Sequence, residues 1–434
     1  MKSPLSPALL TWLALPCAAF AAAPAMDKAT PKLAITAANP LTFSRASQTI
    51  ELSAKDLAPL GEKDLAKVHI LDATGREVLA QAVDLDFDSL HLPDLVIFQA
   101  DFAAGETKRF TATVGAKQTY LKEQFKAFGR FVRERFDDFV WENDRIAHRM
   151  YGKALETWEG EPLTSSTIDI WSKRTPRMVV NDWYLADDYH VDHGEGADFY
   201  SAGRSRGNGG SGLWAADKLW VSNNFVASRV LANGPVRVLF ELDYDAFDVN
   251  GVKVTETKRI SLDAGSNLDH YQSTYRPAAP GALTVGVGLK KVAGAEKSLN
   301  AARGVLTLWE KVEKNQGMQG IALVVDRFGL GDGSPAVLEH LPVSVLKLDR
   351  GVTARVVDDD AARAAELALD QVEGRQQRMG HGRQGRGGED VGPRRLQQVF
   401  GDGLVRNHEG ARQAGRLRSE EHTSELQSQS TISY

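Results

Sequence analysis

The sequence predicts an all-β protein in which a small N-terminal β-sandwich is followed by a large antiparallel β-sandwich. Short runs of alternating polar and apolar residues, bounded by turn residues, recur along the chain. An Asn-Gly pair at residues 250–251 lies between two long alternating runs, which is the strongest short signal for a β-hairpin. The second half of the chain contains no comparable run of helical periodicity.

The small sandwich is expected at residues 30–116. Alternating runs occupy residues 49–52, 68–71 and 95–98, and turn signals such as Ala73-Thr74-Gly75 separate them. Residues 115–126 have the character of a connector. A domain of this type often serves as a structural or docking module.

The large domain is expected at residues 127–326, with a continuation to about residue 357. Runs at residues 236–249 and 252–258 flank the Asn-Gly turn, and a second turn follows at residues 263–266. Further strands are expected at residues 268–275, 283–289, 305–309 and 320–325. Consecutive antiparallel strands with tight turns predict a large sandwich or barrel.

Residues 1–25 have the features of a secretory signal peptide. Lys2 precedes an apolar stretch at residues 9–20, and small residues then offer a cleavage site near Ala21. The stretch is too short for a transmembrane anchor. Cys17 is the one cysteine of the chain, so the mature protein would have no thiol for a disulfide, a nucleophile or a zinc site. We expect a periplasmic or secreted protein with no membrane anchor after cleavage.

The C-terminal residues resemble translated DNA of non-coding origin. Residues 418–434, beginning RSEEHTSELQS, match the translation of a common short-read sequencing adapter. Residues 327–434 hold 14 arginines and one lysine, whereas residues 1–326 hold 17 arginines and 20 lysines. We interpret residues 358–417 as an out-of-frame or disordered segment; a genuine basic, Gly-rich tail is the alternative.

Composition excludes several functional classes. The chain is 42% hydrophobic and 25% charged, as in soluble globular proteins. Its net charge of −5 gives no reason to expect a nucleic-acid partner. The glycines at 207, 209 and 210 match neither a P-loop nor a dinucleotide fingerprint.

The segment at residues 182–211 is the first candidate site. Such a long polar segment in a β-rich domain is where binding residues usually lie. The catalytic candidates are His190, His193, Glu195, Asp198 and Tyr200. These residue types suit general acid–base catalysis near neutral pH. A divalent metal ion held by His190, His193 and Asp198 is a second reading, and a solvated loop is a third. No cofactor is required by the pattern.

Two further clusters are candidates for substrate binding. One combines aromatic and hydrogen-bonding side chains at residues 141–152, as sugar recognition requires, and could equally be an edge strand. The other is a basic patch at residues 171–177, which could neutralise a substrate carboxylate or be ordinary surface charge. The binding candidates are Trp141, Glu142, Asn143, Arg145, Arg149, Tyr151, Lys173, Arg174 and Arg204.

Residues 128–291 resemble a bacterial family described only as domain of unknown function 4861. The segments FVWENDRIAHRMYGKALE, STIDIWSKRTPRMVVNDWY, DYHVDHGEGADFYSAGRSRGNGGSGLW, LANGPVRVLFELDY and VNGVKVTETKRISLDAGSNLDHYQSTY carry the resemblance, in the same order. The resemblance implies secretion together with enzymes that degrade pectin or uronates. It also implies large sheets similar to the galactose-mutarotase-like supersandwich, and it supplies no catalytic residue.

These observations predict an exported enzyme that acts on uronate-containing oligosaccharides or polysaccharides. In a lyase, Arg174 or Lys173 would neutralise the uronate carboxylate, His190 or His193 would remove the C5 proton, and Tyr200 would protonate the leaving oxygen. In a hydrolase, Glu195 and Asp198 would form the carboxylate pair. The alternative is a non-catalytic sugar-binding or envelope scaffold protein with stacking platforms at Trp141, Trp171, Trp183 and Trp214.

Overall fold

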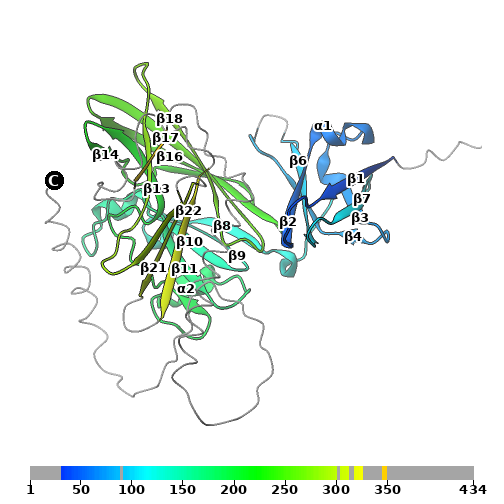
Figure 1. Ribbon diagram of the computed structural model, residues 1–434, viewed down its shortest axis with the longest axis horizontal. Helices are drawn as coiled ribbons and strands as arrows, with labels where there is room; N and C mark the ends of the chain where they lie inside the picture. Colours follow the sequence, from blue (N-terminus) through cyan, green and yellow to red (C-terminus); the bar gives the residue numbers. More distant parts are fainter. Residues whose placement is uncertain (1–30, 88–90, 301–303, 312–316, 326–344, 349–434) are drawn as a thin grey trace, which may run out of the picture.

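A computed structural model describes residues 31–87, 91–300, 304–311, 317–325 and 345–348 (Figure 1). The predicted all-β fold is confirmed: the strands of these residues form six antiparallel sheets. The predicted signal peptide at 1–25, the segment at 358–417 and the adapter-like residues at 418–434 lie outside the described residues. Within the described ranges, no helix has the length and apolar character needed to cross a bilayer.

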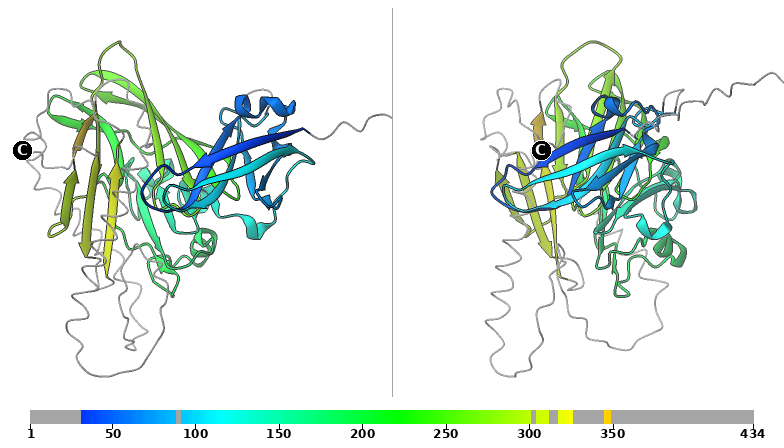
Figure 2. Two further views of the ribbon diagram at one scale, coloured as in Figure 1. Left: turned by 45° about the vertical axis from the view of Figure 1, so that its right-hand side comes forward. Right: turned by 90° about the vertical axis from the view of Figure 1, so that its right-hand side faces the viewer.

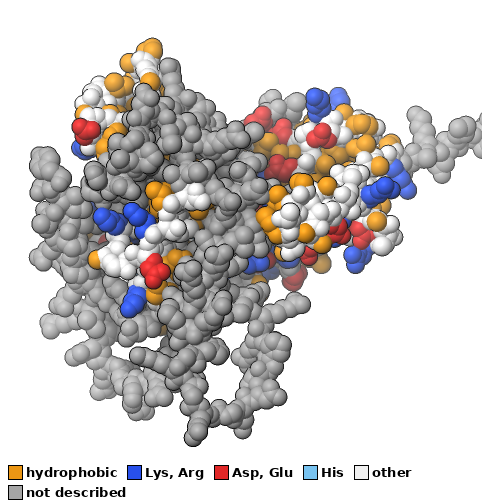
Figure 3. Space-filling model, in the orientation of Figure 1, with side chains coloured by type: hydrophobic (Ala, Val, Ile, Leu, Met, Phe, Trp, Pro, Cys, Tyr) orange, Lys and Arg blue, Asp and Glu red, His pale blue; other side chains and the backbone are white. Residues whose placement is uncertain are grey.

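The N-terminal part is a sandwich of two sheets, seen as a separate lobe in Figure 2, left. The first sheet has the order β1 (Lys32–Ala38), β7 (Thr107–Val114), β3 (Val68–Asp72) and β4 (Glu77–Val78). The second has the order β2 (Arg45–Ser53), β6 (Leu95–Phe102) and β5 (Ala80–Val83). Acidic and basic side chains are interspersed on the visible face of this lobe (Figure 3).

Side chains that alternate between the two faces of each strand form the core of this sandwich. Val68 and Ile70 of β3, Phe98 of β6 and Phe110 of β7 point inward and are buried together. Leu57 closes one end from the helix α1 (Ala54–Leu57), which starts in a capping box between Ser53 and Asp56. The 3₁₀ turns are η1 (Ala58–Leu60) and η2 (Leu65–Lys67).

The larger part contains four sheets. Their strands are β8 (Ala127–Val132), β9 (Asp138–Asn143), β10 (Ile146–Met150), β11 (Asp169–Lys173) and β12 (Gly196–Ala197); β13 (Asn208–Ala215), β14 (Lys218–Trp220), β19 (Val285–Leu289) and β23 (Val345–Leu348); β15 (Ala227–Ala232), β16 (Arg237–Val249), β17 (Val252–Asp263) and β18 (His270–Pro277); and β20 (Glu296–Asn300), β21 (Val305–Lys311) and β22 (Met318–Val324). Short helical segments are η3 (Lys122–Gln124), η4 (Arg133–Arg135), η5 (Lys153–Thr157) and α2 (Val180–Ala186).

The longest ladder is the hairpin of β16 and β17. Its turn residues Asn250 and Gly251 have φ of 49° and 87°, as a type I′ turn demands. The strands pair from Val249 with Val252 down to Arg237 with Asp263, and one irregularity lies between Tyr244 and Phe247. The Asn-Gly signal therefore marked the correct turn.

The sheet of β8 to β12 is buried on both faces, which positions the candidate site. Every residue of β9, β10 and β11 is buried. One face packs Phe139, Trp141 and Ile170 into the main core against Phe240 of β16. The other face carries Val140, Ala147 and Trp171, which are covered by α2 and the segment after it. We call this second face the outer face of the sheet.

Candidate functional site

Arg149 lies at the centre of a buried charge cluster on the outer face. Register places it opposite Asp169 on the neighbouring strand β11. Its Nε and Nη2 atoms donate to Oδ2 of Asp169 at 3.0 and 2.5 Å. Nη2 also donates to Oδ2 of Asp198 at 3.0 Å. One arginine therefore joins two carboxylates that come from a strand and from the segment after α2.

Aromatic rings enclose the Arg149 guanidinium. Its central carbon lies 5.2, 5.3 and 5.4 Å from the ring centroids of Tyr151, Trp171 and Tyr189. Trp171 and Tyr189 stack with 4.8 Å between centroids and 15° between planes. Cation–π attraction and exclusion of water both strengthen the ion pairs of Arg149.

The cluster holds more acids than bases. Asp138, Asp169 and Asp198 are all buried, with Arg149 and Arg135 as the nearby cations. Burial raises the pKa of Asp138 and of Asp169 to about 7, and that of Asp198 to about 6. Because three carboxylates share two arginines, the cluster retains a proton near neutral pH.

His190 connects this cluster to solvent. Its side chain is 58% exposed, and its Nδ1 atom lies 3.5 Å from Oδ2 of Asp198 and 3.4 Å from the Asp198 carbonyl oxygen. Burial of its inner edge and the positive charge of Arg149 lower the pKa of His190. A neutral ring that donates from Nδ1 to the Asp198 carbonyl oxygen leaves Nε2 as a proton acceptor.

An aromatic pair lies near the cluster. Phe136 and Trp158 stack with 4.1 Å between centroids, and Trp158 is 37% exposed. Arg135 lies over both rings and donates to the Tyr189 hydroxyl at 3.0 Å. Phe136 and Asp137 have φ of 48° and 64°, a left-handed conformation that costs non-glycine residues free energy.

Two glycines hold the segment at residues 174–207 against strand β11 and the residue before it. At Gly196, φ is 103° and a Cβ would lie 2.0 Å from the Ser172 carbonyl oxygen. At Gly207, φ is 51° and a Cβ would lie 2.1 Å from the Ile168 carbonyl oxygen. Only glycine fits these approaches, so the chain returns to β11 at Gly196 and again at Gly207.

Two predicted binding residues form a buried structural pair. Lys173 and Glu142 have side chains 0% and 1% exposed, with Nζ 2.7 Å from Oε2. Glu142 also accepts hydrogen bonds from the backbone N–H groups of Val179 and Val180, at the start of α2. Burial lowers the pKa of Lys173. The pair holds α2 against the sheet.

The other loop charges are also paired. Arg174 binds Asp192. Glu195 accepts two hydrogen bonds from Arg177, which lower its pKa. His193 lies 2.9 Å from Asp188 and is well exposed.

The remaining candidates differ in exposure. Four are buried: Trp141, Asn143, Trp171 and Tyr200. Two are exposed: Arg145 and Arg204. Trp141 donates from Nε1 to Oδ1 of Asp269 at 2.9 Å, and Asn143 binds the carbonyls of Asp263 and Ser266. Neither buried tryptophan presents a ring face at the surface. The predicted loop and the predicted binding cluster at residues 141–152 meet at Arg149, Tyr151, Asp198 and His190, and the remaining candidates lie apart from that contact.

Comparison with known proteins identifies the family. The family model for a domain of unknown function, DUF4861, matches residues 37–336. The chain is also 32% identical over 286 residues to a protein of Formosa agariphila called uncharacterized protein P7, covering 64% of this chain and 71% of that protein. The chain belongs to the DUF4861 family. The resemblance noted in the sequence is thereby confirmed.

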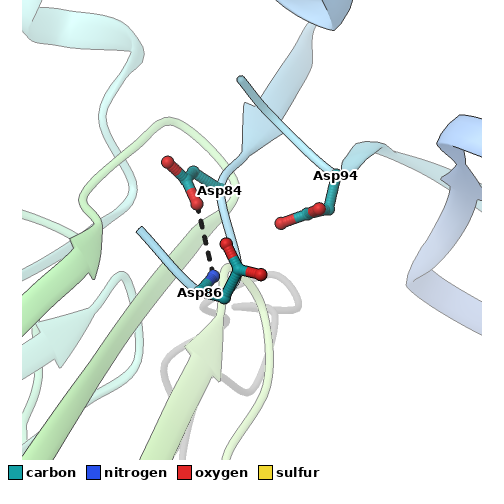
Figure 4. A group of neighbouring side chains, drawn as sticks. All are labelled: Asp84, Asp86 and Asp94. Carbon is teal, nitrogen blue, oxygen red and sulfur yellow. Dashed lines mark hydrogen bonds between the residues drawn. The ribbon is translucent and has the colours of Figure 1, made fainter. Parts of the chain in front are cut away.

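Potential metal ligands in this DUF4861 protein gather away from the cluster. Asp84, Asp86 and Asp94 carry carboxylates within 4.8 Å of one another (Figure 4), whereas in the described ranges His190, His193 and Asp198 form no such group. Two of the three carboxylates already accept hydrogen bonds from the backbone. Asp84 accepts from the N–H of Phe87 at 2.8 Å, and Asp94 accepts from the N–H of Leu85 at 2.6 Å. Acidic turns of this kind are common without a metal.

Sequence reasoning missed several members of the DUF4861 cluster. Asp138, Asp169 and Arg135 were absent from the candidates, and so were Tyr189 and Trp158. Asp169 lies two residues before Trp171 and four before Lys173 on β11, so its side chain is on the same face of the strand; the period of two is the signal that could have found it. Asp138 and Arg135 border a left-handed turn without glycine, and the sequence has no signal for that turn.

Proposed function

We propose that this DUF4861 protein is an exported enzyme that acts on uronate-containing oligosaccharides or polysaccharides, with His190 as the proton-transferring residue. One observation carries the proposal: an exposed imidazole has Nδ1 3.4 Å from the Asp198 carbonyl oxygen and 3.5 Å from the buried Asp198 carboxylate, which is itself held by Arg149. That arrangement fixes the ring and leaves Nε2 free to accept a proton. Export rests on residues 1–25.

A β-elimination uses these groups most directly. Nε2 of His190 would take the C5 proton of a uronate, the C4–O bond would break, and a C4–C5 double bond would form. Arg174 would stabilise the carboxylate of the intermediate after releasing Asp192, to which it is bound. Tyr200, the general acid expected from the sequence, is buried beside Lys290, so water would protonate the leaving oxygen.

A hydrolase is the second candidate, and the pKa values of two loop acids favour it. Asp198 has a pKa raised to about 6, whereas hydrogen bonds from Arg177 lower that of Glu195. A protonated acid and an ionised base are what a glycosidase requires. Asp198 is, however, almost fully buried beneath His190 and already accepts from Arg149. We therefore rank it second.

A non-catalytic sugar-binding protein is the third candidate. Of its four expected stacking platforms, Trp141 and Trp171 are completely buried. Trp158, stacked on Phe136, is a better surface for a sugar ring. Binding through this pair would need no proton transfer at His190.

The test incubates the purified full-length chain with pectic, alginate-like and glucuronate-bearing polysaccharides. Ultraviolet absorbance and new reducing ends are followed together. A rise in both indicates a lyase, and a rise in reducing ends alone indicates a hydrolase. Folded protein that gives neither signal, but binds these polymers in calorimetry, would contradict an enzyme and favour the binding protein.

Two histidine variants test the assignment of the base. His190→Ala is expected to lower kcat/KM by about 10²- to 10⁴-fold, the usual contribution of a general base. His193→Ala is the matched control, because His193 is exposed on the same loop and binds only Asp188 in the described structure. Equal losses in both variants, or none in either, would remove His190 from the mechanism.

A further inference from the structure

A second polar site lies between the sheets, away from the outer face. A cavity of about 100 Å³ is bounded on one side by β17 and β18 and on another by β13, β19 and β22. Its polar wall includes Lys258, Asp269, Tyr271, Ser273 and Tyr275. The facing wall is aliphatic and includes side chains of Val285, Val287 and Leu323. The cavity is therefore polar on one side and apolar on the other.

Strand pairing explains why these polar side chains gather. On β17, alternate residues from Val254 to Leu262 are buried, and Glu256 and Lys258 belong to that series. Lys258 pairs with Ser273, Glu256 with Tyr275, and Ile260 with Tyr271, so the β18 side chains point to the same face. Two charged residues and three hydroxyls thus replace apolar residues in an otherwise buried face.

Part of the hydrogen-bonding capacity of this wall is already used. Lys258 donates from Nζ to Oγ of Ser211 at 2.9 Å and is paired with Glu256. The Tyr275 hydroxyl also donates to Oγ of Ser211, at 2.9 Å. These contacts fix the positions of the polar groups before any ligand arrives, which lowers the entropy cost of binding.

Two buried polar atoms remain unused. Within the described structure, the Tyr271 hydroxyl and Oδ1 of Asn208 are buried and have no hydrogen-bond partner, and both residues line the cavity. Leaving such groups unpaired is costly, so native proteins rarely do it without a ligand or water nearby. A ligand hydroxyl can satisfy either group.

The charges around the cavity cancel. Lys258 is paired with Glu256, and Asp269 lies 2.8 Å from Nε2 of His148. Arg206 is buried near Glu256. Two cations therefore face two carboxylates, and His148 adds charge only when protonated. No excess of positive charge is available to favour an anionic ligand over a neutral one.

We propose that this cavity binds a neutral, hydroxyl-rich ring of the size of one sugar residue. Its hydroxyl edge would contact Tyr271, Ser273 and Asn208, and its less polar face would pack on Val287 and Leu323. Sugar rings have this division between polar edge and apolar face. The cavity is partly open, so a ring can enter while its substituents remain outside.

Calorimetric titration of the full-length chain with methyl glycosides of neutral hexoses and deoxyhexoses, and with glucuronate and galacturonate, tests the proposal. The neutral glycosides are expected to bind and the uronates to bind more weakly. Tyr271→Phe is expected to weaken binding by about 3- to 10-fold, the loss of one hydrogen bond. It should not lower the melting temperature of the ligand-free protein, because that hydroxyl has no partner in the described structure and its removal breaks no hydrogen bond.

Ser273→Leu is expected to fill the cavity and abolish binding, with a melting curve to show that the variant folds. Tyr120→Phe, which removes a hydroxyl bonded to Gln118 in the connector, is the matched control and should bind normally. Absence of binding by any neutral glycoside, tighter binding of uronates, or normal binding by both cavity variants would overturn the proposal. His190→Ala should not alter this binding, so failure here is distinct from failure of the proposed reaction.

Discussion

The buried charges on the outer face divide into a structural pair and a titrating cluster. Lys173 and Glu142 belong to the first kind, because their contacts are made with each other and with the backbone of α2. Glu142→Gln should lower the free energy of unfolding by about 3–5 kcal/mol, because it leaves a buried ammonium without its counter-ion. Urea denaturation measures this. Arg177→Ala, which breaks an exposed pair, should cost about 0–1 kcal/mol. Equal effects would contradict the structural role.

Asp138 belongs to the second kind and makes stability depend on pH. Burial raises its pKa in the folded protein to about 7, whereas an aspartate in an unfolded chain ionises near 4. Between these values the folded state binds more protons, so stability is greatest at low pH and is lost as pH rises towards 7. Asp138→Asn cannot ionise and should remove up to about 1.4 kcal/mol per pH unit of this slope. The test measures the urea midpoint of the wild type and of the variant from pH 5 to pH 8. If the midpoint changes with pH in the same way in both proteins, Asp138 is not the source of the pH dependence.

At the level of elements, strand periodicity predicted the all-β class and several strands, but not the strands β8 to β15 around the site. The runs at residues 49–52, 68–71 and 95–98 lie within β2, β3 and β6, and the turn at residues 250–251 joins β16 to β17. Helix α2 was not predicted, because its seven residues are too few for a helical period and its start is fixed by the distant Glu142. The contact between Arg149 and Asp198 could not be predicted from the sequence either, because it depends on how the loop folds back onto the sheet.

The contribution of the β16–β17 turn to stability can be tested separately from the rest of the fold. Gly251 has φ of 87°, and a β-branched residue adopts that conformation only at a cost of about 1–2 kcal/mol. Gly251→Val should therefore lower stability by about that amount. Gly281→Val is the matched control, because a Cβ there meets no atom within 4 Å and φ is not in the left-handed region. Thermal denaturation followed by circular dichroism compares the two.

At the scale of the whole molecule, the two sandwiches share a joint of apolar and polar contacts. Val83 and Ile97 pack with Leu239 across it. Gln81 is buried there, accepts from the N–H groups of Val236 and Arg237, and donates to the Arg237 carbonyl at 2.9 Å. We therefore expect the two lobes to unfold together.

Gln81→Ala should uncouple the lobes, because it leaves buried backbone groups unpaired at about 1–3 kcal/mol each. Calorimetry is expected to show one transition for the wild type and two for the variant. Gln48→Ala is the control, since that side chain binds only the carbonyl of its neighbour Thr49 within the described residues. A single sharp transition in Gln81→Ala would mean that the apolar contacts suffice.

Gly196, which brings the chain back beside strand β11, has a consequence for how this family can diversify. Residues 174–195 leave β11 at Lys173 and return to pair with the same residue at Gly196, so this loop can change in length or chemistry without shifting the pairing of β9, β10 and β11. A chimera that grafts the corresponding loop of the Formosa protein between Lys173 and Gly196 should fold on the present scaffold and transfer the donor's specificity with it.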